Sequence, residues 1–316
     1  MFKLRRAYSV VFSPCGDRLV STSSSAVVVR QTSVPQKQWV YKIPHPSRLA
    51  FSRDGMSLAV KTTSGRIVVL DPSAEHTPPR VLREDEGEGA APCFSACGRY
   101  LVDGSWDGVL EQRDARTGEV VWRQKFENEQ IRAIHASADR RRWVVVHAPK
   151  ATTHNRPPAP EYLSLWSYPF GARPAAKIFP KHPFVWNSAL TADGEYLLMT
   201  HGAPPAALTL LQVQSGHVIR SVPIEPGGTG LALAWAPNDS YIGSAQNDCV
   251  RFYTPRLEPL SEVALAYPSC VAFSADGRWI ALGSWSSGIL AEREELLSTA
   301  VSTLQGLRGE LMNAGF

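Results

Sequence analysis

A short pattern of apolar and polar positions repeats along this chain. In its clearest copy an apolar run ends at Phe273-Ser274, the pair Asp276-Gly277 follows, and a second apolar run begins at Trp279. An Asp-Gly pair between two apolar runs is a strong signal for a β-hairpin, because such turns need a positive φ that glycine adopts freely. The pattern therefore predicts pairs of antiparallel strands.

The same pattern occurs seven times. In each copy an apolar anchor is followed by a short turn, and successive anchors are separated by 39, 43, 42, 54, 45 and 38 residues. The seven anchors are Phe12, Phe51, Phe94, Ala136, Leu190, Trp235 and Phe273. A period of about 40–45 residues, with several short strands in each unit, is typical of a propeller in which every repeat forms one blade.

Two blades carry further features of a known family. Blade three contains Asp107-Gly108 and then a run that ends at Asp114, and blade two ends its third strand with Leu70-Asp71. With these residues and this period, the chain resembles the WD40 family over residues 1–293. The resemblance implies an all-β, seven-bladed β-propeller with four antiparallel strands in each blade. No blade has the family's Gly-His pair in the loop before its inner strand, so each blade is expected to depend more on packing.

Blade seven lacks a fourth strand in the sequence that follows it. Its third strand is predicted at residues 289–292, and no further strand pattern comes after it. The short alternating segment Phe2-Lys3-Leu4-Arg5 has no other place in the repeat, so we expect this N-terminal strand to close the last blade. Joining both ends in one blade removes the exposed sheet edges that an open array would leave.

Two segments depart from the repeat. Residues 148–160 lie within blade four, whose interval is 12 residues longer than the one before it, and their four prolines predict a loop. Residues 294–316 are predicted to form a separate unit, an amphipathic C-terminal α-helix with its apolar residues on one face. We expect this face to pack on the propeller, and the alternative is that it docks a partner or a second copy. The apolar residues are Leu296, Leu297, Ala300, Val301, Leu304, Leu307, Leu311 and Met312.

The composition of the chain limits the cellular compartments and the classes of partner that we expect. No apolar run approaches the ~18 residues of a membrane span, and the N-terminal sequence lacks the apolar core of a secretory signal. Five cysteines form no disulfide framework, because their number is odd. These features predict a cytoplasmic protein with no membrane partner. The net charge of +4 is mild for this length and does not indicate a nucleic-acid partner.

The sequence offers no catalytic, metal or cofactor site, and we expect a protein without enzymatic activity. Cys93 and Cys97 lie four residues apart, but no second pair completes a tetrahedral metal site. The predicted inner strands are largely apolar, and the exceptions in blade four, Arg132 and His135, do not make a catalytic set. The alternative is a propeller hydrolase or lactonase with a site in the central channel.

Two tryptophans, Trp106 and Trp285, stand in glycine- and serine-rich turns between the second and third strands of their blades. The resemblance places these turns on the face that commonly binds partners, and tryptophan is enriched among interface hot spots. The alternative is that each ring folds over its neighbouring blade. The same face is expected to carry Lys61, an acidic loop at residues 84–88 and the insertion at residues 148–160. The candidate partner-binding residues are Trp106, Trp285, Asp107, Glu84, Asp85, Glu86, His154 and Arg156.

These features predict a non-enzymatic protein–protein interaction module that uses one propeller face. Its acidic loops favour a partner with a basic patch, because complementary charges steer association. A scaffold and a cognate toxin inhibitor, that is, an immunity protein, are the two forms that we consider. Self-association through the C-terminal helix remains open.

Overall fold

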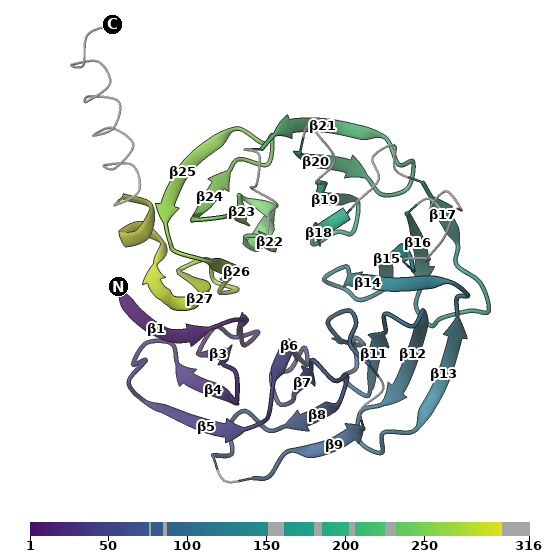
Figure 1. Ribbon diagram of the computed structural model, residues 1–316, viewed down its shortest axis with the longest axis horizontal. Coiled ribbons are helices and arrows are strands. Elements are labelled where there is room, and N and C mark those ends of the chain that lie inside the picture. Colours follow the sequence, from purple (N-terminus) through teal and green to yellow (C-terminus); the bar gives the residue numbers. More distant parts are fainter. Residues whose placement is uncertain are drawn as a thin grey trace, which may run out of the picture.

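Seven small antiparallel sheets stand in a ring around a central channel (Figure 1). The computed structural model describes residues 1–298 apart from residues 76, 85–86, 151–160, 180–184, 202–205 and 225–231. The fold is an all-β, seven-bladed β-propeller, as the repeat predicts, and a short helix follows the last strand at residues 293–298. Within the described residues, no helix is long and apolar enough to cross a bilayer.

Each blade runs from an inner strand at the channel to an outer strand at the periphery (Figure 1). Blades one to three contain β2 (Val10–Phe12), β3 (Arg18–Thr22), β4 (Ala26–Gln31), β5 (Gln38–Lys42); β6 (Pro46–Phe51), β7 (Leu58–Thr62), β8 (Ile67–Leu70), β9 (Arg80–Arg83); and β10 (Cys93–Phe94), β11 (Tyr100–Gly104), β12 (Val109–Asp114), β13 (Val120–Lys125). Blades four and five contain β14 (Glu129–Ala136), β15 (Arg142–Pro149), β16 (Tyr162–Ser167), β17 (Ala176–Ile178); and β18 (Val185–Leu190), β19 (Tyr196–His201), β20 (Ala207–Gln212), β21 (Val218–Pro223). Blades six and seven contain β22 (Ala232–Trp235), η1 (Pro237–Asp239), β23 (Ile242–Ala245), β24 (Cys249–Tyr253), β25 (Pro259–Ala264); and β26 (Pro268–Phe273), β27 (Trp279–Glu292), β1 (Phe2–Ala7).

The turns between the first and second strands share one backbone feature in all seven blades. Each of these turns contains a residue with positive φ, a conformation that crowds the Cβ of every residue except glycine. Blade seven uses Gly277 at a φ of 69°, as the Asp-Gly pattern predicts. Blade four has Arg140 at a φ of 60° instead, and blade six has Asn238 at 56° and Asp239 at 52°. The positive φ of the turn is therefore kept even in blades whose sequence lacks glycine at this position.

The N-terminal strand closes the ring, as expected. β1 pairs antiparallel with β27, with Phe2 opposite Leu290 and Leu4 opposite Gly288. β27 also pairs with β26, so this long element supplies the middle of blade seven. Leu4 is fully buried in a cluster that includes Leu290 and Ala281. Closure thus rests on hydrogen bonds along the strand and on apolar burial beneath it.

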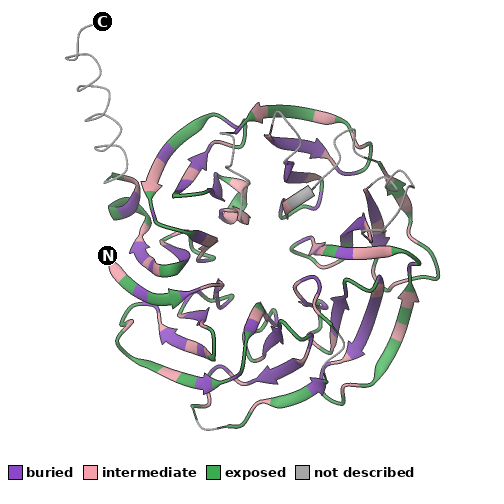
Figure 2. Ribbon diagram, viewed as in Figure 1, coloured by how far each residue is buried: buried purple, intermediate pink, exposed green. Residues whose placement is uncertain are grey.

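The hydrophobic core lies largely between neighbouring blades. One cluster joins Val20 and Val29 of blade one to Leu58 and Val60 of blade two. Figure 2 shows the same organisation, with buried residues concentrated in the middle strands and exposed residues along the outer strands. Because every cluster needs two sheets, each blade is stabilised by its neighbours.

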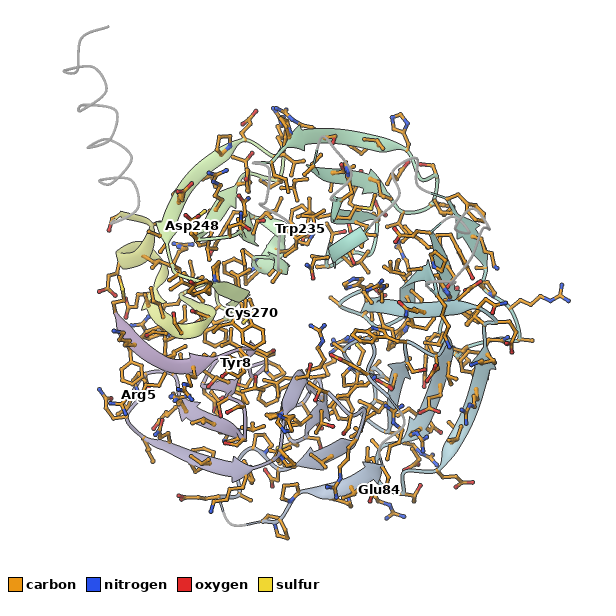
Figure 3. The ribbon with its side chains drawn as sticks, in the orientation of Figure 1. Arg5, Tyr8, Glu84, Trp235, Asp248 and Cys270 are labelled. Carbon is orange, nitrogen blue, oxygen red and sulfur yellow. The ribbon has the colours of Figure 1, made fainter. Side chains whose placement is uncertain are left out.

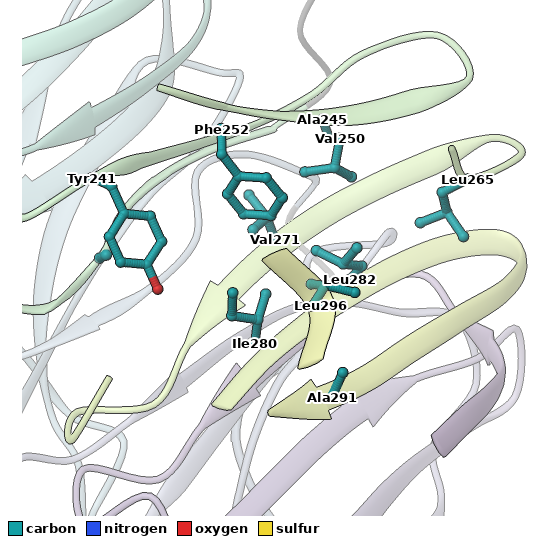
Figure 4. Packing of buried hydrophobic residues seen from close by; sticks show 11 residues of the cluster. Tyr241, Ala245, Val250, Phe252, Leu265, Val271, Ile280, Leu282, Ala291 and Leu296 are labelled. Atoms are coloured by element: carbon teal, nitrogen blue, oxygen red, sulfur yellow. The ribbon is translucent and has the colours of Figure 1, made fainter. Parts of the chain in front are cut away.

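The first turns of the C-terminal helix pack on the propeller. Leu296 is 1% exposed and belongs to a cluster with Ile280, Leu282 and Ala291 (Figure 4). Leu297 is partly buried against the same cluster. The rest of the predicted apolar face lies beyond residue 298, outside the described residues, so its packing or docking role stays a prediction.

Candidate functional site

A cavity of about 820 Å³ occupies the mouth of the central channel. All seven blades contribute to its wall, through their inner strands, the loops that lead into them and the turns between second and third strands. We call the side on which these loops and turns lie the binding face. The volume falls within the range of ~300–1,000 Å³ that is usual for ligand sites.

Trp106 and Trp285 both line this cavity, Trp106 from the turn between β11 and β12 and Trp285 from within β27, which continues as a strand where the sequence predicts a turn. The backbone N–H of Trp106 donates to the Glu88 carbonyl at 2.8 Å, and that of Trp285 donates to the Tyr267 carbonyl at 3.1 Å. In each case the acceptor lies in the loop that leads into the inner strand of the same blade. Since blades three and seven stand across the channel from each other (Figure 1), the two rings reach one cavity from opposite sides.

The two rings differ in how far they are covered. Trp285 packs at a tilt against Tyr8, which leads into the neighbouring blade, with ring centroids 4.5 Å apart, yet it remains 59% exposed. Trp106 is 37% exposed. Trp285 thus partly follows the alternative in which the ring folds over the next blade, but both rings still present apolar surface to a partner.

A buried ion network between blades two and three lies beneath the blade-three tryptophan. Lys61 Nζ donates to both carboxylate oxygens of Asp103, at 2.8 and 3.0 Å, and to the Gly104 carbonyl at 2.8 Å. Arg83 donates to Asp103 at 2.6 Å and to Glu111 at 3.1 Å. Burial lowers the pKa of Lys61, and the Asp103 carboxylate opposes that shift.

The network corrects one expectation. Lys61 is fully buried, whereas the sequence placed it on the exposed face. A buried ammonium is tolerated here because all its donors have acceptors, two of them on a carboxylate. Because Gly104 precedes the Trp106 turn by one residue, the network also fixes the base of that turn.

The acidic residues of the candidate set do not gather at the cavity. Glu84 lies at the periphery of the ring (Figure 3), where its carboxylate is 3.3 Å from Arg66. Asp107 is exposed next to Trp106, and Lys150 donates to it at 2.7 Å. Both carboxylates are therefore paired with cations, which lowers the negative charge of this region. The remaining members of the set lie outside the described residues: Asp85, Glu86, His154 and Arg156.

Two arginines that the candidate set omits line the cavity, Arg48 and Arg132. Each lies at an irregularity of its inner strand, where the register shifts between Pro46 and Arg48 in β6 and between Ile131 and Ala133 in β14. Such bulges redirect side chains and are common next to functional sites. Both guanidinium groups are exposed to the cavity, and among the described residues neither has an ion pair or hydrogen bond.

Only part of this arrangement had a signal in the sequence. Arg132 stands out there as a charge within an otherwise apolar inner strand. Arg48 is the third residue of β6, next to a register shift that no pattern in the sequence marks. That both reach one cavity depends on the closure of the ring.

His135 and Ser188 form a polar pair in the same wall. The Nε2 atom of His135 is 2.8 Å from the Ser188 hydroxyl oxygen. Burial lowers the pKa of His135 to about 4, so its imidazole is neutral at pH 7. A hydroxyl in contact with an imidazole has the form of a nucleophile and its base, although a base with such a low pKa is weak.

Blade four contains a second hydrogen-bonded chain, which is sealed. Glu129 contacts His147 Nδ1 at 2.9 Å, His147 Nε2 contacts the Ser164 hydroxyl at 2.7 Å, and Trp166 Nε1 donates to the same hydroxyl at 2.7 Å. The first three residues have the spacing of an acyl-transfer triad. His147 and Ser164 are fully buried, so a substrate cannot reach them. The chain ties three strands together, a contribution beyond the packing that the sequence led us to expect.

The described residues contain no group of three or more His, Cys, Asp or Glu side chains placed to hold a metal ion. The charged and polar groups of the cavity wall therefore include two arginines, one glutamate, the imidazoles of His45 and His135 and several hydroxyls, beside two tryptophans. Such a wall recognises and orients a bound group.

Comparison with known proteins supports the fold. A solved structure titled Kuenenia stuttgartiensis Hydrazine Synthase is similar over 92% of this chain and 96% of the matched chain, with a TM-score of 0.75 and 14% sequence identity. No protein-family model matches the chain, and no curated protein does. At this identity the likeness shows the fold alone. The chain is a seven-bladed β-propeller, a scaffold whose function depends on the site it carries.

Proposed function

We propose that this chain is a protein-binding module whose contact surface is the mouth of the central channel. The observation that carries the proposal is the pair Trp106 and Trp285, which reach one cavity from opposite sides of the ring. Tryptophan offers a large apolar contact area at a small cost in conformational entropy, which is why it dominates many interfaces.

The rigidity of the binding face supports this role. The backbone at Trp106 and at Trp285 is held by hydrogen bonds within each residue's own blade. The buried Lys61 and Asp103 side chains add a further support below the Trp106 turn. A surface ordered before binding loses little freedom on association, so more of the contact energy appears as affinity.

The test compares three single variants in recovery of a partner from a lysate of the natural host. Trp106→Ala and Trp285→Ala should each weaken binding about 30-fold, because hot-spot truncations cost about 2 kcal/mol or more. Ile219→Ala is the matched control, since Ile219 is 49% exposed on β21 at the outer edge, away from the cavity. Equal recovery and equal affinity for all three variants would refute the proposal.

The proposal also covers the family, the compartment and the role of the protein. We propose membership of the WD40 family on the strength of the period and of the Asp107-Gly108 and Leu70-Asp71 segments. We further propose a cytoplasmic protein that acts as a scaffold or as a cognate toxin inhibitor (immunity protein), with its five free cysteines kept reduced. We still predict that the acidic loop at residues 84–88 faces a basic patch of the partner. The contact of Arg66 with Glu84 reduces the negative charge that this loop offers.

A second candidate is a hydrolase with its site in the channel. The hydrogen bond between His135 and Ser188 in the cavity wall favours it. A fluorophosphonate probe should then label Ser188, and Ser188→Ala should abolish both labelling and ester hydrolysis. Ser164→Ala is the matched control, because that serine is sealed in the core. Absence of labelling together with absence of turnover would exclude this candidate.

A further inference from the structure

The wall of the channel mouth is cationic. Arg48 comes from blade two and Arg132 from blade four, and Glu88 is the one acidic residue among the described residues of the lining. His135 adds no charge at pH 7, because burial lowers its pKa to about 4. Two arginines without partners in the described structure, set against one carboxylate, favour an anionic ligand.

Cys270 is a further residue of the cavity wall, and the charge of Arg48 has a small effect on it. On blade seven, burial raises the pKa of Cys270 to about 11, and the guanidinium of Arg48 opposes that rise. Cys270 lines the same cavity and lies at the inner end of its blade (Figure 3).

The rest of the wall suits a peptide. Hydroxyl groups line it, among them Ser9, Ser24 and Ser47, and these groups both donate and accept hydrogen bonds with a peptide backbone. Two tryptophans at the rim offer apolar contact to side chains that flank the buried group. A volume of about 820 Å³ holds several residues of a projecting loop or tail, far more than a single carboxylate requires.

We propose that the channel mouth receives an acidic peptide segment of the partner protein. Its carboxylates lie against Arg48 and Arg132, which are able to bind them through paired hydrogen bonds. The side chains next to them contact Trp106 and Trp285. This inference rests on the proposed protein-binding function and names the chemistry of the partner at the centre of the binding face.

The experiment measures fluorescence anisotropy with three labelled, end-capped peptides. Each contains six identical residues between two leucines, and the six are glutamate, glutamine or lysine. The glutamate peptide should bind the full chain, and Arg48→Gln and Arg132→Gln should each weaken it about tenfold, as expected for loss of one charge-assisted contact. Arg141→Gln is the matched control, because Arg141 is an exposed arginine in the β14–β15 turn outside the cavity. Circular dichroism checks that all variants are folded.

Four outcomes overturn the inference. They are no binding of the glutamate peptide, equal binding of the glutamine or lysine peptide, unchanged affinity in the double arginine variant, and displacement by free succinate as readily as by unlabelled peptide. The last outcome identifies a small-anion site instead. If the arginine variants bind normally while Trp106→Ala loses the natural partner, the acidic-peptide inference fails and the proposed function stands. If neither set of variants changes any binding, both fail.

Discussion

Replacing Asp103 by asparagine removes one charge from the buried network and leaves its shape unchanged. Oδ1 of Asp103 accepts from Lys61 at 2.8 Å, and Oδ2 accepts from Lys61 at 3.0 Å and from Arg83 at 2.6 Å. Whichever way the asparagine amide is turned, its NH₂ group faces a donor. Lys61 and Arg83 would then lose the carboxylate that they share, and Glu111 would be the acidic side chain left to them in the network.

The expected cost is large because all four side chains are at most 4% exposed. Breaking a buried ion pair by removing one partner costs about 3–5 kcal/mol, since the remaining charge stays in the interior. Lys61→Met should cost less, roughly 1–3 kcal/mol. It removes a buried charge, leaves Asp103 paired with Arg83, and only deprives the Gly104 and Ala90 carbonyls of a donor.

Urea unfolding followed by circular dichroism at pH 7 measures both free energies. Asp248→Asn is the control for the charge change, because Asp248 is exposed at the surface. We expect the loss in free energy of unfolding to be largest for Asp103→Asn, smaller for Lys61→Met and smallest for the control. It is refuted if Asp103→Asn lies within about 1 kcal/mol of the wild type, or if Lys61→Met is the more damaging change.

Two further predictions concern closure of the ring and pH. Leu4→Ala should lower the free energy of unfolding by about 2–5 kcal/mol, because the Leu4 side chain of the closing strand β1 is fully buried. Leu260→Ala, at a site 46% exposed, should change it by less than about 0.5 kcal/mol, and equal effects in urea titrations would contradict the closure argument. His135, with its pKa lowered to about 4, binds its proton more readily in the unfolded chain. Its contribution is therefore fully present above pH 6.5 and is lost as the pH falls toward 4. Between pH 7 and pH 5 the wild type should lose up to about 2 kcal/mol more than His135→Gln, and parallel profiles would disprove the assignment.

Some functional residues are marked by the few residues next to them in the sequence, and others depend on contacts with distant parts of the chain. Trp106 and Trp285 were singled out because the few residues around each are unusual for a buried strand, although the structure places only Trp106 in a turn and Trp285 within β27. Arg48 was missed because no pattern in the sequence marks the register shift beside it in β6, and its role depends on blades that lie far along the chain. The Glu129–His147 contact was missed because the family's usual pair is absent, so no motif marked it.

The sequence by itself determined seven repeats, their hairpin turns and the strand that closes the ring, because strand alternation and turn chemistry act between residues close together along the chain. The tertiary structure decided what those repeats enclose. Lys61 meets Asp103 across 42 positions of sequence, and Arg48 and Arg132 share one cavity only because seven sheets are set at fixed angles around a channel. The closed ring brings charges on different blades together in space. The pattern of apolar and polar residues acts only between neighbours along the chain, so it does not show which distant residues will meet.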